Sequence, residues 1–336
     1  AMVSAVLVSA APASADARIG KFTVTFAEGV FHRNGDFVIP GAVRGVSADG
    51  DFKADRAFGN YQRQDVTLVG HVMIHQRVAG GASGELMTLT AQQVRIAGKP
   101  SSYTATGSVV VVQANRRLHA DYLQLNEATH QGLLRGNVSV QENDRVVNSA
   151  EIHYNTLTGA IEVPAELTGF SSDTDFRADR GFGNQKAGTF TMIGNVVVHR
   201  FGNYGKANNS TEPLTLWCDK LDIVQRPQTT YTATGHVKVA QGDRTLVAPV
   251  LTLNDTTHVA TMTGGVHGEE RPDRTFDAAE LLYNTQTEDF KALGGVKATF
   301  PFRRASSGPS PTPSARPSAA VPQNSSPTPL PAPTRS

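Results

Sequence analysis

Residues 103–113 read YTATGSVVVVQ, and residues 231–241 read YTATGHVKVAQ. In both segments a glycine is followed by apolar residues at every second position, a period typical of a half-buried antiparallel strand that leaves a turn. The same unit, Gly-x-Val followed by a further apolar residue, begins at Gly70, Gly136 and Gly194. We therefore expect a chain built almost entirely of antiparallel strands.

The differences between the two copies indicate which face of the strand is buried. Val110 is replaced by Lys238, whereas Val109 and Val111 are retained as valine. Because successive side chains of a strand point to opposite faces, the odd-numbered positions should face the interior in both copies.

The likeness extends over most of the chain and indicates a tandem duplication. Residues 51–60, DFKADRAFGN, match residues 175–184, DFRADRGFGN, at a spacing of 124, and the spacing widens to 129 between Tyr154 and Tyr283. Small insertions in surface loops account for such a drift. A third copy of the junction appears at Gly295-Val296, where we expect a last strand that closes the open end.

One strand of each repeat should be bent. Leu118 and Ala120 share one phase of the alternation, whereas Leu123 and Leu125 have the other. A switch of phase needs an extra residue, so we expect a bulge or bend near Asp121. Only residues 84–94, GELMTLTAQQV, could form a short helix, although the corresponding segment of the second repeat contains a proline.

The two ends of the chain differ from its middle. An apolar stretch over residues 3–11 precedes Ala13-Ser14-Ala15, a pattern typical of a secretory signal peptide and its cleavage site. Nine of the 18 prolines lie beyond residue 305 among Ser, Thr and Ala, a composition that stays extended. We expect a signal peptide over 1–15, β domains over 16–165 and 166–304, and a disordered Pro/Ser-rich tail over 305–336.

Composition excludes several classes of function. With 31 Lys and Arg against 30 Asp and Glu, the net charge of +1 gives no field that would attract nucleic acid. One cysteine, Cys218, forms no internal disulfide, and no apolar run is long enough to span a bilayer.

No residue pattern predicts catalysis, a cofactor or a metal site. The histidine pairs His75/His199 and His130/His258 repeat between the copies, but neither has a second ligand at a chelating spacing, so we interpret them as structural. The aspartates of the repeated DF(K/R)ADR segments are interpreted as part of a strand that ends in a turn. There is no GxSxG motif and no phosphate-binding glycine loop. We expect a protein that is not an enzyme.

The order ATGxVxVxQ, LxAxxLxLN, GNVSVQE and AEIHYNT, met in residues 105–156 and in part again in the second copy, resembles the OstA-like domains of the LptA-type lipopolysaccharide transport family. The resemblance covers roughly residues 40–304. It implies two tandem, twisted β-jellyroll slabs of antiparallel strands, a periplasmic location near the outer membrane and an interior that holds lipid acyl chains. The residues that it assigns to lipid binding are Val109, Val111, Leu123, Leu125, Val138 and Val140 in the first repeat, and Val237, Val239, Leu251, Leu253 and Val266 in the second.

The resemblance also implies partners: lipopolysaccharide or another envelope glycolipid, other components of lipopolysaccharide transport joined through edge strands, and an end-to-end homo-oligomer. Two alternatives stay open. The first is a structural envelope scaffold that assembles through edge strands and carries no lipid. The second is a parallel β-helix enzyme or polysaccharide binder, which the uneven spacing of the glycine-led strands disfavours.

Overall fold

The structure, a computed structural model, describes residues 15–19, 22–77, 86–98, 101–201, 213–287 and 289–299. Residues 1–14 of the expected signal peptide and the whole expected tail therefore lie outside the described residues. All described strands belong to one compact unit. No helix in these ranges has the length and apolar character that crossing a membrane requires.

Every regular element in the described ranges is a β-strand, and every pairing is antiparallel, which confirms the expected fold class. The first half of the sheet comprises β1 (Ala15–Ile19), β2 (Phe22–Phe26), β3 (Val30–Phe31), β4 (Asp36–Ile39), β5 (Val43–Ser47), β6 (Gly50–Ala54), β7 (Arg56–Asn60), β8 (Asp65–Arg77), β9 (Leu86–Gly98), β10 (Ser101–Gln113), β11 (Arg116–Asn126), β12 (Gln131–Glu142) and β13 (Arg145–Asn155). The second half comprises β14 (Ala160–Val163), β15 (Leu167–Phe170), β16 (Thr174–Ala178), β17 (Arg180–Asn184), β18 (Thr189–Arg200), β19 (Leu214–Val224), β20 (Thr230–Gln241), β21 (Arg244–Asn254), β22 (Val259–Glu270), β23 (Arg274–Asn284), β24 (Phe290–Leu293) and β25 (Lys297–Thr299).

The short helix that residues 84–94 could have formed is not present over residues 86–94, which lie in strand β9. Both edges of β9 are hydrogen-bonded, one to β8 and the other to β10. Alternating threonines and apolar residues suit such a central strand, and the sheet pairing overrides a weak helical propensity.

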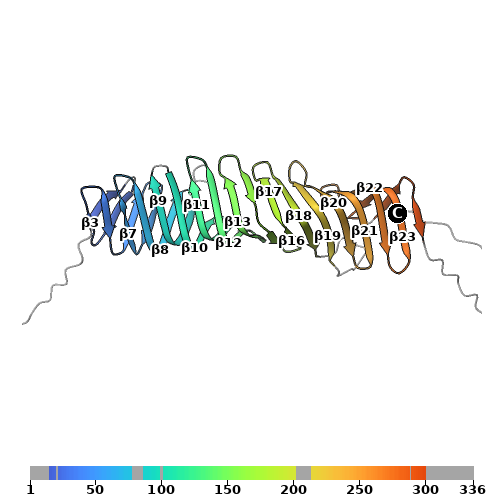
Figure 1. Cartoon of the computed structure of the whole chain (residues 1–336), viewed down its shortest axis with the longest axis horizontal. Helices are drawn as coiled ribbons and strands as arrows, with labels where there is room; N and C mark the ends of the chain where they lie inside the picture. Colours follow the sequence, from blue (N-terminus) through green and yellow to red (C-terminus); the bar gives the residue numbers. More distant parts are fainter. Residues whose placement is uncertain are drawn as a thin grey trace, which may run out of the picture. The chain divides into compact units, whose positions relative to one another are not determined.

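Hairpins connect the long strands in chain order, from β8 to β13 and again from β18 to β23 (Figure 1). The short strands lie in pairs end to end. β14 and β15 both pair with β13, and on their other edges they pair with β17 and β16, which both pair with β18. Each short pair is thus one strand interrupted by a bend, and the expected domain boundary at 165/166 lies in such a bend.

The bends explain the repeated glycines. In β10, Gly107 and Ser108 have φ angles of 78° and 47°, and both lie opposite the single residue Asp121 of β11. Two residues facing one is a β-bulge, and it bends the strand. The bend predicted near Asp121 is confirmed, but the glycine lies in the middle of a long strand and not in a turn before it.

Asp55 and Asp179, at the end of the repeated DF(K/R)AD segments, stabilise two of these bends. Asp55 donates its N–H to the carbonyl of Gly70 at 3.0 Å, and its carboxylate contacts Nδ1 of His71 at 2.7 Å. At the equivalent bend, Nδ2 of Asn195 donates to the Asp179 carboxylate at 2.9 Å. These aspartates therefore lie at bends within the sheet. The strand that follows each of them ends in a turn, at residues 61–64 and 185–188, as expected from the sequence.

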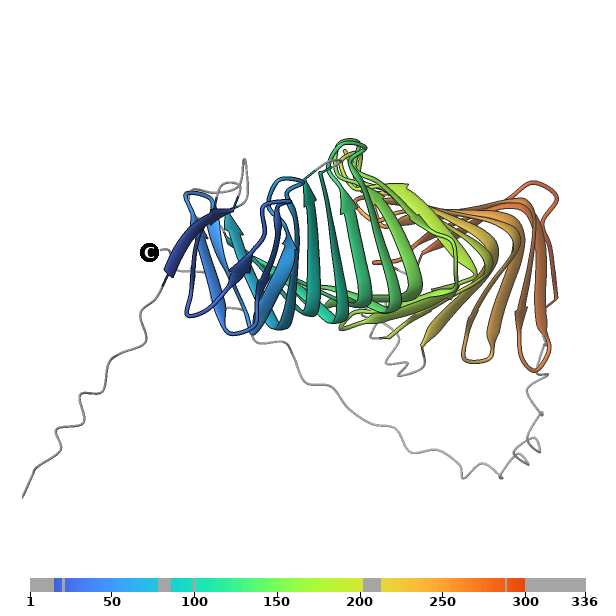
Figure 2. The ribbon, with the colours of Figure 1, turned by 60° about the vertical axis from the view of Figure 1, so that its left-hand side comes forward.

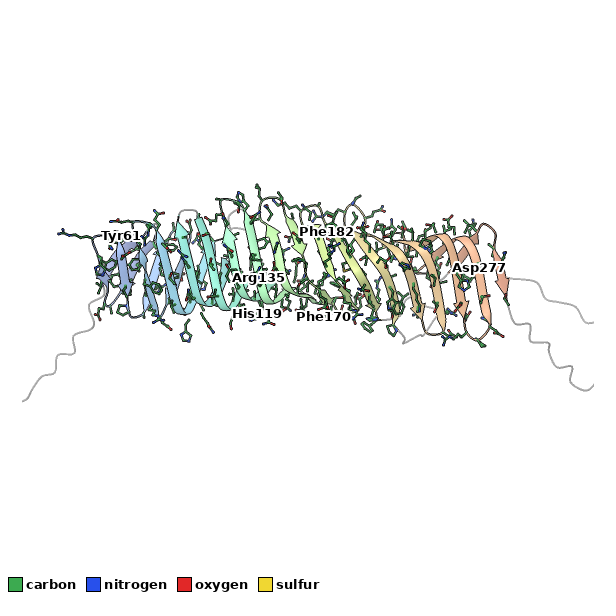
Figure 3. The ribbon with its side chains drawn as sticks, in the orientation of Figure 1. Tyr61, His119, Arg135, Phe170, Phe182 and Asp277 are labelled. Atoms are coloured by element: carbon green, nitrogen blue, oxygen red, sulfur yellow. The ribbon has the colours of Figure 1, made fainter. Side chains whose placement is uncertain are left out.

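The bends divide the sheet into two arms, which continue through both repeats (Figure 2). We call the part that contains β14 and β17 the upper arm, and the part that contains β15 and β16 the lower arm. In β10 the upper arm is residues 101–106 and the lower arm is residues 109–113. Tyr61 and Phe182 of the upper arm lie along one long side of the sheet, and His119 and Phe170 of the lower arm lie along the other (Figure 3).

Candidate functional site

Between the arms lies an interior lined by continuous rows of apolar side chains. In the lower arm, directly paired residues of successive strands form one row: Val24, Gly45, Phe52, Ile74, Leu89, Val111, Leu118, Val140, Val147, Gly169, Phe176, Val198, Leu216, Val239, Leu246, Gly268, Phe276 and Ala298. No polar side chain interrupts this row where the first repeat meets the second. The two repeats therefore share one continuous interior.

A matching row follows the upper arm: Phe31, Phe37, Gly59, Val66, Ile96, Tyr103, Leu125, Gly132, Tyr154, Ile161, Gly183, Phe190, Ile223, Tyr231, Leu253, Ala260, Tyr283 and Phe290. This row differs from the lower one in its four tyrosines. An aromatic ring with a hydroxyl suits a boundary between an apolar interior and water.

All the residues expected to bind lipid lie on the interior side of the sheet, but at two depths. Those beside a bend are fully buried: Val109, Leu123, Val138, Val237 and Val266. Those farther from the bend are half-buried: Val111, Leu125, Val140, Val239 and Leu253. Leu251 lies beside its bend, as Leu123 does, but is half-buried. Burial decreases away from the bend on both arms, so the interior is packed at the bend and becomes accessible towards the strand ends. Contact of these residues with a lipid stays a prediction.

Sequence reasoning missed a set of aromatic residues that lie across glycines of the neighbouring strand. The ring of Phe52 covers Gly45, and the ring of Phe176 covers Gly169 in the same way. Tyr154 covers Gly132, and burial raises the pKa of its hydroxyl. A Cβ atom at any of these glycines would overlap the ring. The signal in the sequence was the recurrence of Gly45 and Phe52 as Gly169 and Phe176.

The outer rim of the lower arm carries the same Arg-Glu-Arg register in both repeats. In the second repeat, Arg244 and Arg274 both contact Glu270, at 3.3 and 3.2 Å. In the first repeat, Arg116 contacts Glu142 at 2.9 Å. The charged rim therefore follows directly beyond the apolar row of this arm.

Carboxylates accompany tyrosines at the rim of the upper arm. Burial, together with Glu127, raises the pKa of the Tyr103 hydroxyl. Burial and Asp255 raise the pKa of Tyr231, while Arg200 and Arg145 of the lower arm act in the opposite direction. Charged groups therefore lie at both rims, and two arginines of the lower arm act on the pKa of Tyr231 in the upper arm.

One contact joins the two rims across the repeats. Arg116 lies in the lower arm of the first repeat. When the amide of Gln185 is oriented with its oxygen towards this guanidinium, it accepts from Nη1 and Nη2 at 2.8 and 2.9 Å. Gln185 follows β17, so it belongs to the upper arm of the second repeat. The lower arm of one repeat therefore faces the upper arm of the next, and the middle of the interior is built from both repeats.

The histidine pairs take structural positions. Nδ1 of His75 and of His199 contact Asp51 and Asp175 on the neighbouring strands, at 3.1 and 2.7 Å. His130 and His258 occupy turns, with φ angles of 56° and 57°. Within the described ranges, no three His, Cys, Asp or Glu side chains gather into a site that could hold a metal ion.

The fold and the interior define an antiparallel β protein with two continuous apolar rows between its arms. Residues 51–160 match the family described as "LptA/(LptD N-terminal domain) LPS transport protein". The resemblance expected from the sequence is confirmed over these residues. No curated protein matches the chain.

Among solved structures, the chain is similar to LptH, described as the LptA homologous periplasmic component of the conserved lipopolysaccharide transport device from Pseudomonas aeruginosa. The identity is 10%, and the likeness covers 55% of this chain and 94% of LptH, with a TM-score of 0.19. A superposition at that TM-score supports no conclusion about shared geometry. The family match over residues 51–160 is the finding that links this chain to known proteins.

Proposed function

We propose that this chain is a non-enzymatic periplasmic protein of lipopolysaccharide transport, which holds the acyl chains of lipopolysaccharide or a similar glycolipid between its two arms. The family matched by residues 51–160 supports the transport class. The two uninterrupted apolar rows support the mode of binding, because an acyl chain needs continuous apolar contact. This continuity is the observation on which the proposal depends.

The decrease of burial from the bend to the rim suits transfer better than storage. Burying one CH₂ group is worth about 0.8 kcal/mol, so full enclosure of a 14-carbon chain is worth on the order of 10 kcal/mol. A closed cavity would release such a chain slowly. In an interior that is accessible along its length, an acyl chain can exchange one set of apolar contacts for the next.

Edge strands provide the means to join neighbouring transport components. Within the described ranges, β24 and β25 pair only with β23, so each has one unpaired edge. Unpaired edges present free N–H and C=O groups to an added strand. Other transport components, or a second copy of the chain, are the partners that this edge would accept.

The test uses a photoreactive benzoylphenylalanine at Val111 and, as a matched control, at Val110 of the same strand. Val111 lies in the interior row, whereas Val110 has the opposite phase. We expect lipopolysaccharide to crosslink at Val111 and not at Val110. Equal labelling at the two positions, or no labelling with the protein folded, would contradict the proposal.

A scaffold without cargo is the second candidate, because the side chains beside each bend already fill the space between the arms. It predicts polymers that grow with protein concentration, without lipid in an organic extract of the purified protein. Sedimentation together with mass spectrometry of that extract distinguishes the two functions.

A further inference from the structure

Five of the bends share one backbone geometry. In each of them, a glycine with a φ angle between 75° and 79° precedes a residue whose φ angle lies between 43° and 47°. The five pairs are Gly70-His71, Gly107-Ser108, Gly136-Asn137, Gly194-Asn195 and Gly235-His236. Because the angles agree so closely across both repeats, the bend is one fixed structure that recurs along the sheet.

Side chains brace four of these five bends. In each, an aspartate that lies beside the bend in the sheet contacts the side chain of the second bend residue. The four contacts are Asp55–His71, Asp121–Asn137 and Asp219–His236 at 2.7 Å, and Asp179–Asn195 at 2.9 Å. We call such a contact a brace. A change of the backbone angles at the bend would break it, so the brace holds the angle between the arms.

The bend of β22 departs from this geometry. Its residues Gly264 and Gly265 have φ angles of 91° and 97°, and Pro249 of β21 lies beside them. At the matching bend of β12 in the first repeat, Asp121 and Asn137 form a brace. Glycine has no side chain that could donate to a carboxylate, and proline has no carboxylate that could accept. The brace therefore cannot form at β22.

The next bend shows the same kind of change. Residues 294–296, Gly-Gly-Val, join β24 to β25, whereas residues 164–166, Pro-Ala-Glu, join β14 to β15 at the matching place in the first repeat. In the first repeat, the proline ring fixes one φ angle, and Oγ of Ser149 donates to the carbonyl of Glu166 at 2.9 Å. In the second, Ala278 takes the place of Ser149, and the two glycines have φ angles of 73° and 61°.

We propose that Gly264-Gly265 and Gly294-Gly295 form a hinge, at which the two arms of the last strands change their angle while the braced bends hold the arms of the preceding strands fixed. Glycine adopts positive and negative φ angles about equally well, so each Gly-Gly pair has backbone conformations that a braced histidine or asparagine lacks. What the hinge does for cargo rests on the proposed function. Arms that move apart at this end would admit or release a lipid without the loss of a strand.

The test measures the distance between the arms by pulsed electron paramagnetic resonance on nitroxide labels. Ala128→Cys with Asp144→Cys labels the turns at the two ends of β12, and Thr256→Cys with Asp273→Cys labels the matching turns of β22. All four positions are exposed, whereas the native Cys218 is buried. We expect the distance distribution across β22 to be about twice as broad as that across β12, because two glycines replace a glycine and a braced asparagine.

Transfer of the brace provides the decisive variant. Pro249→Asp together with Gly265→Asn introduces the pair that Asp121 and Asn137 form in the first repeat, and it should narrow the distribution across β22 to the width found across β12. Pro249→Ala is the matched control, because it introduces no carboxylate and should leave the width across β22 unchanged. Asp121→Ala removes the brace from β12 and should broaden the distribution there.

The outcomes separate the hinge from the proposed function, since all these distances are measured without lipid. Equal widths across β12 and β22, or an unchanged width in the variant that gains the brace, overturn the hinge and leave lipid binding as it stands. Crosslinking at Val111 reports on lipid binding alone. Circular dichroism verifies that each variant retains its strands. If the variant that gains the brace does not fold, Asp121→Ala decides, because an unchanged width across β12 would show that the brace does not hold the arms.

Discussion

Arg116 and Gln185 join the two repeats across the rims of the interior, and with the Gln185 amide oxygen turned towards Arg116 the guanidinium nitrogens lie 2.8 and 2.9 Å from it. The same guanidinium also donates from Nε to Glu142. Its counterpart in the second repeat, Arg244, donates from Nε to Glu270 at 3.3 Å within its own rim. The comparison of these two arginines isolates the contribution of the contact between arms.

Replacing Arg116 should therefore destabilise the protein more than replacing Arg244. Arg116→Ala loses hydrogen bonds to both rims, whereas Arg244→Ala loses one ion pair on its own rim. We expect a difference of about 1 kcal/mol, since hydrogen bonds that involve a charged group contribute more than exposed ion pairs. The midpoints of urea unfolding measure it. Equal midpoints for the two variants would show that the contact between arms adds nothing.

The bends should not tolerate a side chain at their glycines. Gly136 has a φ angle of 76°, and a Cβ atom there would lie 2.5 Å from Oδ2 of Asp121. Gly136→Ala should cost about 1–2 kcal/mol from the left-handed backbone alone, with the overlap adding to it. Gly41→Ala is the control, because nothing lies within 4 Å of the added atom. Thermal unfolding of the two variants provides the comparison, and an unchanged Tm for Gly136→Ala would be inconsistent with the bend described here.

Truncation of two neighbouring residues of one strand should destabilise the protein to different extents. Val237 is fully buried, whereas Lys238 is exposed and places its ammonium 5.2 Å from the centroid of the Trp217 ring. Val237→Ala should cost about 2 kcal/mol through lost apolar contact and a residual cavity. Lys238→Ala should cost about 0.5 kcal/mol, the value of an exposed cation–π contact. Chemical unfolding of both variants checks the assignment of faces, and a larger loss for Lys238→Ala would reverse it.

Cys218 should be inert in the folded protein. It is 4% exposed, and burial, with a smaller effect of Asp219, raises the pKa of its thiol to about 12. The thiol therefore stays protonated up to that pH in the folded state, while it ionises near pH 9 when unfolded. Stability from this group is complete below pH 9 and is lost as the pH rises towards 12.

Thiol titration with a disulfide reagent at pH 8 should detect no reactive group until urea unfolds the chain. Cys218→Ser is the matched control, because it should show no reaction in either state. Rapid labelling of the native protein would mean that the β19 strand is not packed as described.

Several elements of the fold could be predicted from the sequence, because a comparison of the two copies shows which positions keep their apolar residue. The change of Val110 to Lys238 identified the buried face, and the phase switch around Asp121 located the bend. The sequence alone left a short helix open for residues 84–94, because their alternation is short; residues 86–94 lie in a strand. The aromatic residues of the interior escaped notice because each ring lies over a glycine of another strand.

The sequence by itself determined the antiparallel strands, their inward faces and their bends, since these depend on the period of the side chains and on glycines that adopt positive φ. Only the tertiary structure decided that the two repeats share one interior. That outcome depends on which arm lies opposite which, and the contact between Arg116 and Gln185 joins residues 69 positions apart that no local pattern relates. The duplicated YTATG segments are therefore two portions of one continuous sheet.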